Sequence, residues 1–167
     1  MLARWLTGVL TREVRTLIRE LAAYPDEQQI WATPPGVSNS AGTLALHLAG
    51  NLNHFVGGVL GGSGYRRDRD AEFARRHVPR AELERELESV VTMLEQVVPT
   101  LDQATLDAPY PAPPGGYSVV TGDFLVHLAS HLAYHIGQVD YHRRLITGAA
   151  TSVGPQSIGE LATGRKG

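Results

Sequence analysis

Proline and glycine residues divide this chain into a small number of segments that are long enough to form helices. Proline inside a helix removes a backbone hydrogen bond, and glycine weakens a helix. Between these residues lie four stretches in which apolar side chains recur every three or four positions, which is the spacing of an amphipathic helix. The four stretches cover residues 2–24, 40–60, 79–99 and 122–147. The sequence shows no alternation of apolar and polar residues of the kind that indicates a strand.

Four amphipathic helices without strands predict an all-α protein, a four-helix bundle in which inward-facing side chains can build a site. Two connections are long: the charged segment YRRDRDAEF at residues 65–73, and a segment rich in proline at residues 109–114. They argue against a simple up-down-up-down order of the helices. We expect one domain over residues 1–150 and an irregular tail over residues 151–167.

The ends of the helices can also be predicted. Asn39 or Ser40 can cap the second helix, and Thr121 can cap the fourth, because a short side-chain oxygen accepts a bond from a free N–H group of the first turn. Pro79 suits the first position of the third helix. The first helix should present its apolar side through Trp5, Val9, Leu17 and Leu21.

The composition excludes several classes of protein. Without cysteine the chain forms no disulfide, zinc ribbon or iron–sulfur cluster, and a metal site needs nitrogen and oxygen ligands. Fifteen basic and seventeen acidic residues give a net charge of −2, which lacks the basic excess typical of nucleic-acid binding. No uncharged apolar run approaches the roughly 18 residues that cross a bilayer, and the one near the N-terminus is too short for a signal peptide. We therefore expect a cytoplasmic protein that binds neither nucleic acid nor membrane.

The histidines are concentrated in two of the predicted helices. Six of the seven lie in the second and fourth stretches, at His47, His54, His127, His131, His135 and His142. At about 100° per residue, those of the fourth stretch form one stripe with Gln138, bordering the apolar face of the helix. Asn51 shares the corresponding edge of the second stretch. Histidines in such positions are at least partly buried, and their ring nitrogens need partners.

A divalent metal ion can satisfy several buried imidazoles together. Two histidines four residues apart project from consecutive turns of a helix and can both reach one ion, and His127/His131 and His131/His135 have this spacing. One more ligand from the second helix would make three, with a position left for water or substrate, as in catalytic sites. Neutral imidazole suits several divalent ions. We expect zinc, nickel or iron.

The segments LALHLAGNLNHF and HLASHLAYHIGQVDYHRRL resemble those of the DinB-like (YfiT-like) superfamily of metal-binding four-helix bundles. The resemblance covers most of the chain, and HLAYHIGQ is its most specific part. It implies that His47, His131 and His135 hold the metal. It also implies homodimers, and activities such as S-transfer with bacterial low-molecular-weight thiols or metal-dependent isomerisation of maleylpyruvate.

The histidines outside this triad leave several roles open. His127, His54 or His142 could replace a ligand or lie around the metal as proton carriers. His127 is the candidate general base, because an imidazole pKa near 6.5 suits proton transfer at neutral pH. Gln138 and Asn51 could orient a ligand or a bound water, or could instead form a hydrogen bond between helices.

We favour a metal-dependent enzyme, a thiol S-transferase or a hydrolase, that activates a water or a thiol and acts on a small-molecule thiol or electrophile. Since the chain has no cysteine, the thiol would come from the substrate. One alternative is a non-catalytic metal-binding or stress-related interaction module, and another is a metal-free bundle with core histidines. The segment YRRDRDAEF could bind an anionic substrate, but a solvated network of ion pairs is the favoured interpretation.

Overall fold

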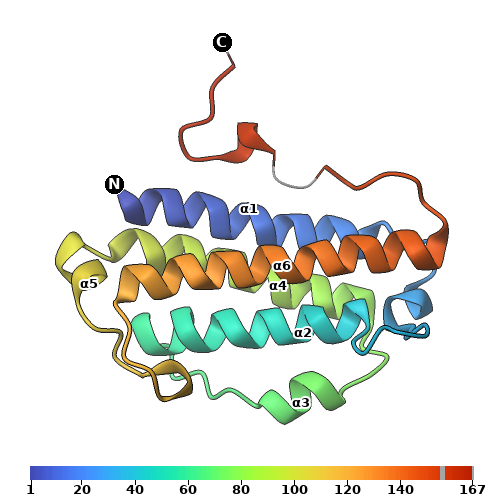
Figure 1. Ribbon diagram of the computed structural model, residues 1–167, viewed down its shortest axis with the longest axis horizontal. Coiled ribbons are helices and arrows are strands. Elements are labelled where there is room, and N and C mark those ends of the chain that lie inside the picture. Colours follow the sequence, from blue (N-terminus) through green and yellow to red (C-terminus); the bar gives the residue numbers. More distant parts are fainter. Residues whose placement is uncertain (155–156, 167) are drawn as a thin grey trace.

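The computed structural model describes residues 1–154 and 157–166. Among these residues, four long helices form a bundle (Figure 1). They are α1 (Leu2–Ala22), α2 (Ala41–Leu52), α4 (Arg80–Val97) and α6 (Thr121–Thr147). The described residues contain no strand, and only an isolated bridge joins Pro109 to Val120. The prediction of an all-α four-helix bundle is confirmed.

The helices are not ordered as a simple up-down-up-down bundle. Figure 1 shows α1 and α6 running in one direction, and α2 and α4 in the opposite one. Each of α1 and α2 packs against both α4 and α6. Consecutive α2 and α4 therefore point the same way, so the chain must return along the bundle between them. The long charged connection makes this return, and the predicted departure from simple up-down-up-down order is confirmed, whereas the connection rich in proline joins the antiparallel α4 and α6.

Short helices interrupt the connections. The charged connection holds α3 (Arg69–Ala74), and the connection rich in proline holds α5 (Gln103–Asp107). A π-helix, η2 (Asn53–Leu60), continues α2 without a break. The remaining elements are 3₁₀ turns: η1 (Glu27–Trp31), η3 (Val98–Thr100), η4 (Pro114–Gly116) and η5 (Ile158–Glu160).

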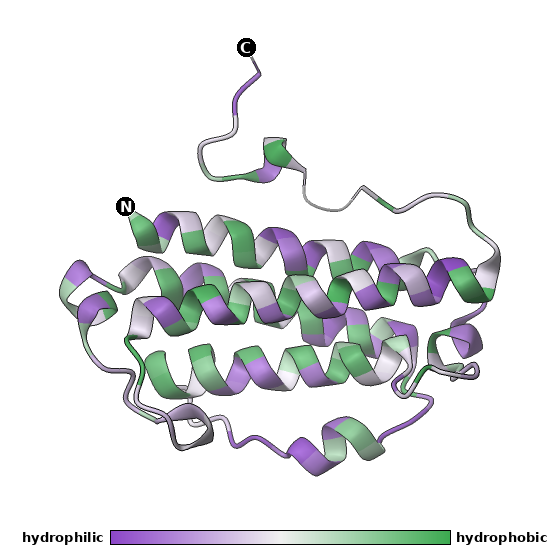
Figure 2. Cartoon of the chain, in the orientation of Figure 1, coloured by the Kyte–Doolittle hydropathy of each residue, from purple (hydrophilic) through white to green (hydrophobic). Residues whose placement is uncertain are grey.

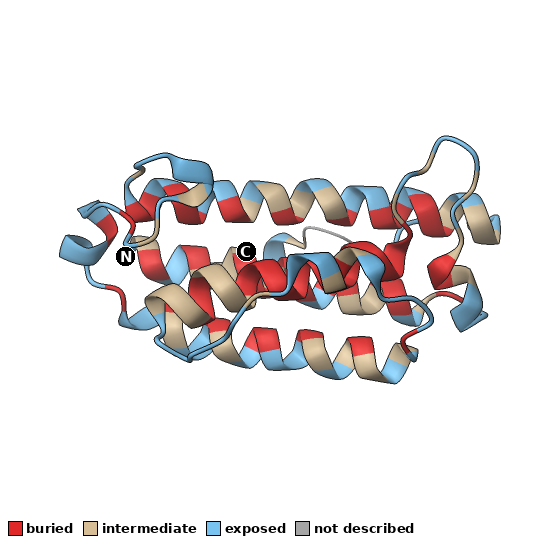
Figure 3. Ribbon diagram, turned by 90° about the horizontal axis from the view of Figure 1, so that it is seen from below, coloured by how far each residue is buried: buried red, intermediate tan, exposed pale blue. Residues whose placement is uncertain are grey.

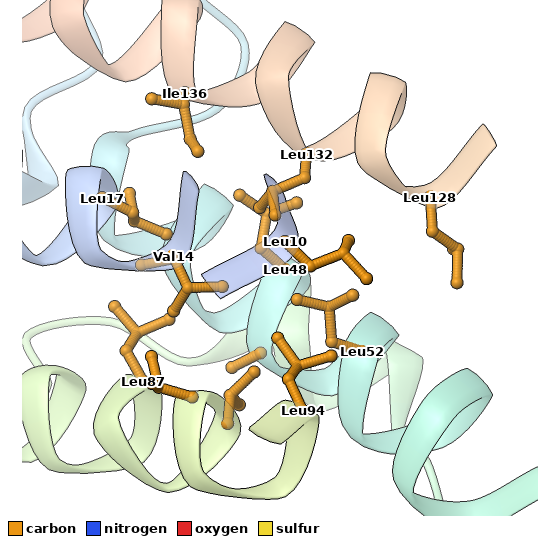
Figure 4. Packing of buried hydrophobic residues seen from close by; sticks show 14 of the residues in the cluster. Leu10, Val14, Leu17, Leu48, Leu52, Leu87, Leu94, Leu128, Leu132 and Ile136 are labelled. Carbon is orange, nitrogen blue, oxygen red and sulfur yellow. The ribbon is translucent and has the colours of Figure 1, made fainter. Parts of the chain in front are cut away.

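The core runs along the axis of the bundle, between the four long helices. Hydrophobic residues recur along each of these helices, with polar residues between them (Figure 2). Buried residues lie mainly on the inner sides (Figure 3). In Figure 4 the apolar side chains come from all four helices: Leu10, Val14, Leu17, Leu48, Leu52, Leu87, Leu94, Leu128, Leu132 and Ile136. Each side chain of this size contributes about 1.5–3 kcal/mol when fully buried.

Some predicted details of the helices are confirmed and others are wrong. The Ser40 hydroxyl caps α2 by accepting a bond from the Thr43 N–H group. Thr121 does not cap α6, because its hydroxyl donates to the Ala108 carbonyl and Val120 occupies the cap position. Pro79 lies one residue before α4. Trp5 is 45% exposed and lies outside the core, since the inward positions of α1 belong to its neighbours Leu6 and Leu10.

The chain turns back after α6. Gly148 ends this helix with φ of 72°, in the left-handed region that glycine adopts without strain. In Figure 1 the tail lies beyond α1, on the side of the bundle away from α3. There Arg4 donates to the Ala162 carbonyl. The division into a domain over 1–150 and an irregular tail over 151–167 stays a prediction, and residues 155, 156 and 167 lie outside the described part.

Candidate metal centre

Three histidines converge where α2 and α6 pack against each other. The Nε2 atom of His131 lies 3.1 Å from Nε2 of His135 and 3.4 Å from Nε2 of His47. All three side chains offer a ligand atom within 4.8 Å of the others. Ligands placed tetrahedrally at about 2.0–2.1 Å from an ion are about 3.3–3.4 Å apart. The spacing of these nitrogens therefore fits a single ion.

Helical periodicity places these rings. On α6, the buried Leu128, Leu132 and Ile136 hold the apolar face against the core. His131 and His135 precede two of them by one residue, so both lie on the same edge and are partly buried. His47 comes from the buried centre of α2 and is 6% exposed.

The outer nitrogen of His47 is held by an acidic side chain. Its Nδ1 lies 3.1 Å from Oε2 of Glu72, on α3. Arg67 Nη2 is also 3.3 Å from this Nδ1, but a guanidinium can only donate. The Nδ1–H group therefore donates to Glu72, and the lone pair of His47 is left on Nε2, facing the other two histidines. A carboxylate in this position fixes the tautomer and raises the basicity of a ligating imidazole.

Glu72 is itself fixed on both sides. Arg67 pairs with both of its carboxylate oxygens, at 2.6 and 2.8 Å. On the α2 side, Gly50 makes room for it, because a Cβ atom there would lie 2.1 Å from Oε1 of Glu72. Burial by itself would raise the pKa of Glu72, but the hydrogen bonds from His47 and Arg67 outweigh it and hold that pKa below its ordinary value.

The segment YRRDRDAEF is therefore not a solvated network of ion pairs throughout, which was the interpretation that the sequence favoured. Arg67 and Glu72 do not belong to a solvated network, because both side chains are largely buried against His47. The sequence held a weak signal for this: Asp68 begins a short helix, accepting a bond from the Ala71 N–H group at 2.9 Å. Such a cap indicates an ordered element in place of a loose connection.

Gln138 holds the outer nitrogen of His135. Its Oε1 atom accepts a hydrogen bond from Nδ1 of His135 at 2.7 Å, which leaves Nε2 of that ring with its lone pair. Asn51, which the sequence suggested for a similar role, is buried on α2. Its side chain forms no hydrogen bond with the described residues.

The site keeps His131 and His135 neutral. Burial, together with repulsion from the neighbouring His135 and His47 when they are protonated, lowers the pKa of His131 to about 4. Burial also lowers the pKa of His135. A proton on either ring would be both desolvated and repelled, whereas a neutral ring offers its lone pair to a cation.

The remaining histidines have different surroundings. His127 is exposed on α6, with its ring stacked 6.2 Å from that of His131. His54 lies on η2 beside Phe55. Its buried Nδ1 has no partner among the described residues, and burial lowers its pKa. His77 is exposed between α3 and α4.

His142 has partners away from the triad. Its Nδ1 accepts from the Tyr24 hydroxyl at 2.6 Å, and its Nε2 donates to the Ala32 carbonyl at 2.8 Å. It lies seven residues after His135, which is about 10 Å along the helix. His127 and Gln138 thus lie next to the three converging histidines. His142 does not, because it bonds to Tyr24 and Ala32.

Comparison with known protein families agrees with this architecture. A model of the DinB superfamily matches residues 10–139, a span that includes His47, His131 and His135. The chain belongs to the DinB superfamily. A comparison with curated proteins gave no match. Membership in the DinB superfamily and a histidine cluster that could hold an ion are both compatible with metal binding. None of the described helices combines the length and the apolar character needed to cross a membrane.

Proposed function

We propose that this DinB-superfamily protein binds one divalent metal ion through the Nε2 atoms of His47, His131 and His135. The observation that carries the proposal is the convergence of three Nε2 atoms from two helices. Two of the three rings have their Nδ1 atoms engaged by Glu72 and Gln138, so their free lone pairs point to a common centre. The lowered pKa values of His131 and His135, which keep these two rings neutral at pH 7, support the same proposal.

The three histidine ligands also suit a metal ion that keeps one coordination position open to water or substrate. Neutral imidazoles are good ligands for zinc, nickel and iron. Within the described part of the chain, the histidine cluster offers three ligands and no fourth histidine or carboxylate. Structural zinc sites normally have four protein ligands, whereas catalytic ones have three and keep a position for water or substrate.

We infer that the protein is a metal-dependent enzyme, of thiol S-transferase or hydrolase type. An ion bound at this centre would lower the pKa of a coordinated water or thiol. His127 is exposed one helical turn from His131 and is our candidate to accept the released proton. The thiol would belong to the substrate, since the chain has no cysteine.

The first experiment measures metal content. Untagged protein should retain about one zinc, nickel or iron ion per chain, and His131→Ala and His135→Ala should each weaken zinc binding by at least tenfold in calorimetry. His77→Asn, on an exposed residue with φ of 56° that asparagine tolerates, is the control and should bind as the wild type does. If the double variant His131→Ala/His135→Ala binds zinc as the wild type does, the assignment of the metal ligands is wrong.

The second experiment tests catalysis. Pairs of low-molecular-weight thiols and electrophiles are supplied to the metal-loaded protein, to the chelator-treated protein and to His127→Ala. Turnover that requires both the metal and His127 supports the enzyme. A fully loaded protein without turnover, and with a fourth protein ligand in its coordination shell, would favour a non-catalytic metal-binding module.

We also propose that the protein forms homodimers, as the family resemblance implies. An apolar groove between α1 and α6 offers a surface for the second copy, with Trp5 45% and Val126 48% exposed. Light scattering should give twice 18.1 kDa. Val126→Glu should give the monomer, whereas Val120→Glu, at an equally exposed position outside the groove, should not. A wild-type monomer at high micromolar concentration overturns this proposal.

A further inference from the structure

A cavity of about 360 Å³ lies beside the histidine cluster, near the C-terminal half of α6. One wall is the loop of residues 36–39, which leads into α2, and Leu44 continues it. The other wall consists of Gln138, Tyr141, His142 and Leu145. This volume lies within the range of about 300–1,000 Å³ that is typical of small-molecule sites.

The lining selects an uncharged ligand. Leu44, Leu145 and the Tyr141 ring supply apolar surface. Polar contacts come from hydroxyl and amide groups, and no acidic side chain, lysine or arginine is among the described lining residues. Both nitrogens of the His142 ring have partners within the protein, Tyr24 and the Ala32 carbonyl, so this ring is not free to pair with a charged ligand. A charged ligand would lose its hydration here without gaining an ionic partner.

Gln138 connects the cavity to the metal centre. Its Oε1 atom accepts from Nδ1 of His135, while its side chain lines the cavity. Its NH₂ group has two donors, which leaves it able to bind a ligand on the cavity side. On the other wall, Leu44 precedes His47 by three residues. Since one turn of a helix rises about 5.4 Å, the cavity begins about one turn from the triad on both helices.

We propose that this cavity binds the uncharged, partly apolar body of the substrate, with the Gln138 amide donating to it and the reactive end directed towards the three histidines. This inference rests on the proposed function for its link to the metal. The ligand class follows from the cavity lining alone. The substrate would then be a neutral amphipathic molecule of the size of a substituted benzyl or cyclohexyl group.

The test uses three fluorinated probes of one shape and different charge. 4-Fluorobenzyl alcohol should bind to the full-length protein with a Kd in the millimolar range, measured by ¹⁹F NMR. 4-Fluorobenzoate and 4-fluorobenzylamine should bind at least tenfold more weakly. Tyr141→Ala should raise the Kd for the alcohol at least tenfold. Tyr134→Ala is the matched control, because it removes a similarly exposed tyrosine of α6 that does not line the cavity.

Two further measurements separate this inference from the proposed function. The alcohol is titrated into zinc-loaded and chelator-treated protein, and zinc content is determined in parallel. Zinc retention without probe binding, equal binding of the charged probes, or an unchanged Kd in Tyr141→Ala overturns the cavity inference and leaves the metal site standing. Probe binding without zinc retention overturns the proposed function, and with it the direction of the reactive end, while the ligand site remains.

Discussion

Glu72 accepts a hydrogen bond from Nδ1 of His47 over 3.1 Å, although the two residues belong to different helices and are separated by 25 positions. The helix that carries Glu72, α3, has six residues, and Arg69, Asp70 and Ala74 are exposed. Glu72 is its buried residue. This short helix brings a negative charge to the His47 nitrogen opposite the proposed metal, and its Phe73 ring lies 5.0 Å from the His47 ring.

Glu72→Gln should weaken zinc binding by about 10- to 100-fold, the usual effect of losing an outer partner of a ligating histidine. Glutamine keeps the size and an acceptor oxygen, but it removes the charge that makes His47 more basic. Calorimetric titration with zinc measures the change. Glu86→Gln is the control, since Glu86 lines the same small cavity as Glu72 but bonds to no described histidine. Equal affinity in the two variants would remove Glu72 from the site.

Gly50→Ala should also weaken zinc binding, by displacing Glu72. The added methyl group would lie 2.1 Å from Oε1 of Glu72, so the carboxylate must move away from His47. Gly137→Ala provides the contrast, because its Cβ would meet nothing within 4 Å on α6. There the substitution should raise stability by about 0.5–1 kcal/mol, as alanine does in a helix interior. Thermal unfolding and zinc titration of both variants distinguish the two effects, and unaltered zinc affinity in Gly50→Ala would contradict this account.

The bundle could be predicted because it depends on helical periodicity, whereas the choice of His47, His131 and His135 among the helical histidines followed from the family resemblance. A spacing of four residues puts His131 and His135 on one edge of α6 whatever the rest of the fold does. The same periodicity gives the inward faces of four helices. Trp5 shows where this reasoning is weak. A large apolar residue near the end of a helix can lie at the margin of the apolar face, and the sequence alone does not say whether another surface covers it.

Glu72 and His142 could not be placed from the sequence, for different reasons. The contact of Glu72 with His47 depends on how the connection folds back over α2, and on the missing side chain of Gly50, neither of which is periodic. His142 shares the histidine stripe of α6, but two turns beyond His135 the helix faces different neighbours. There Tyr24 and the Ala32 carbonyl satisfy the ring. The angular position of a residue shows on which face of its helix it lies. It does not show which other parts of the protein that face contacts along the helix.

Arg143→Met should destabilise the protein by about 3–5 kcal/mol, the range found when one partner of a buried ion pair is removed. Arg143 pairs with Glu20 of α1 and with Asp140, and the side chains of Arg143 and Glu20 are 3% and 0% exposed. Its loss leaves the Glu20 charge buried without compensation. The matched control is Arg15→Met, which breaks an ion pair with Glu95 whose side chains are 45% and 48% exposed. That substitution should change the free energy of unfolding, measured with urea, by less than about 1 kcal/mol.

The stability of the metal-free protein should fall as the pH drops from about 6.5 towards 4. In the unfolded chain His131 titrates near 6.5, whereas in the folded protein its pKa is about 4. Between these values the unfolded state binds a proton that the folded state does not, so acid favours unfolding, and above the window this contribution to stability is complete. The loss from His131 should be on the order of 1–2 kcal/mol once solvent exposure is allowed for. Urea unfolding at several pH values measures it. His131→Gln should flatten the profile, and equal stability of the wild type at pH 7 and pH 4.5 would show that the ring is not held neutral in the folded state.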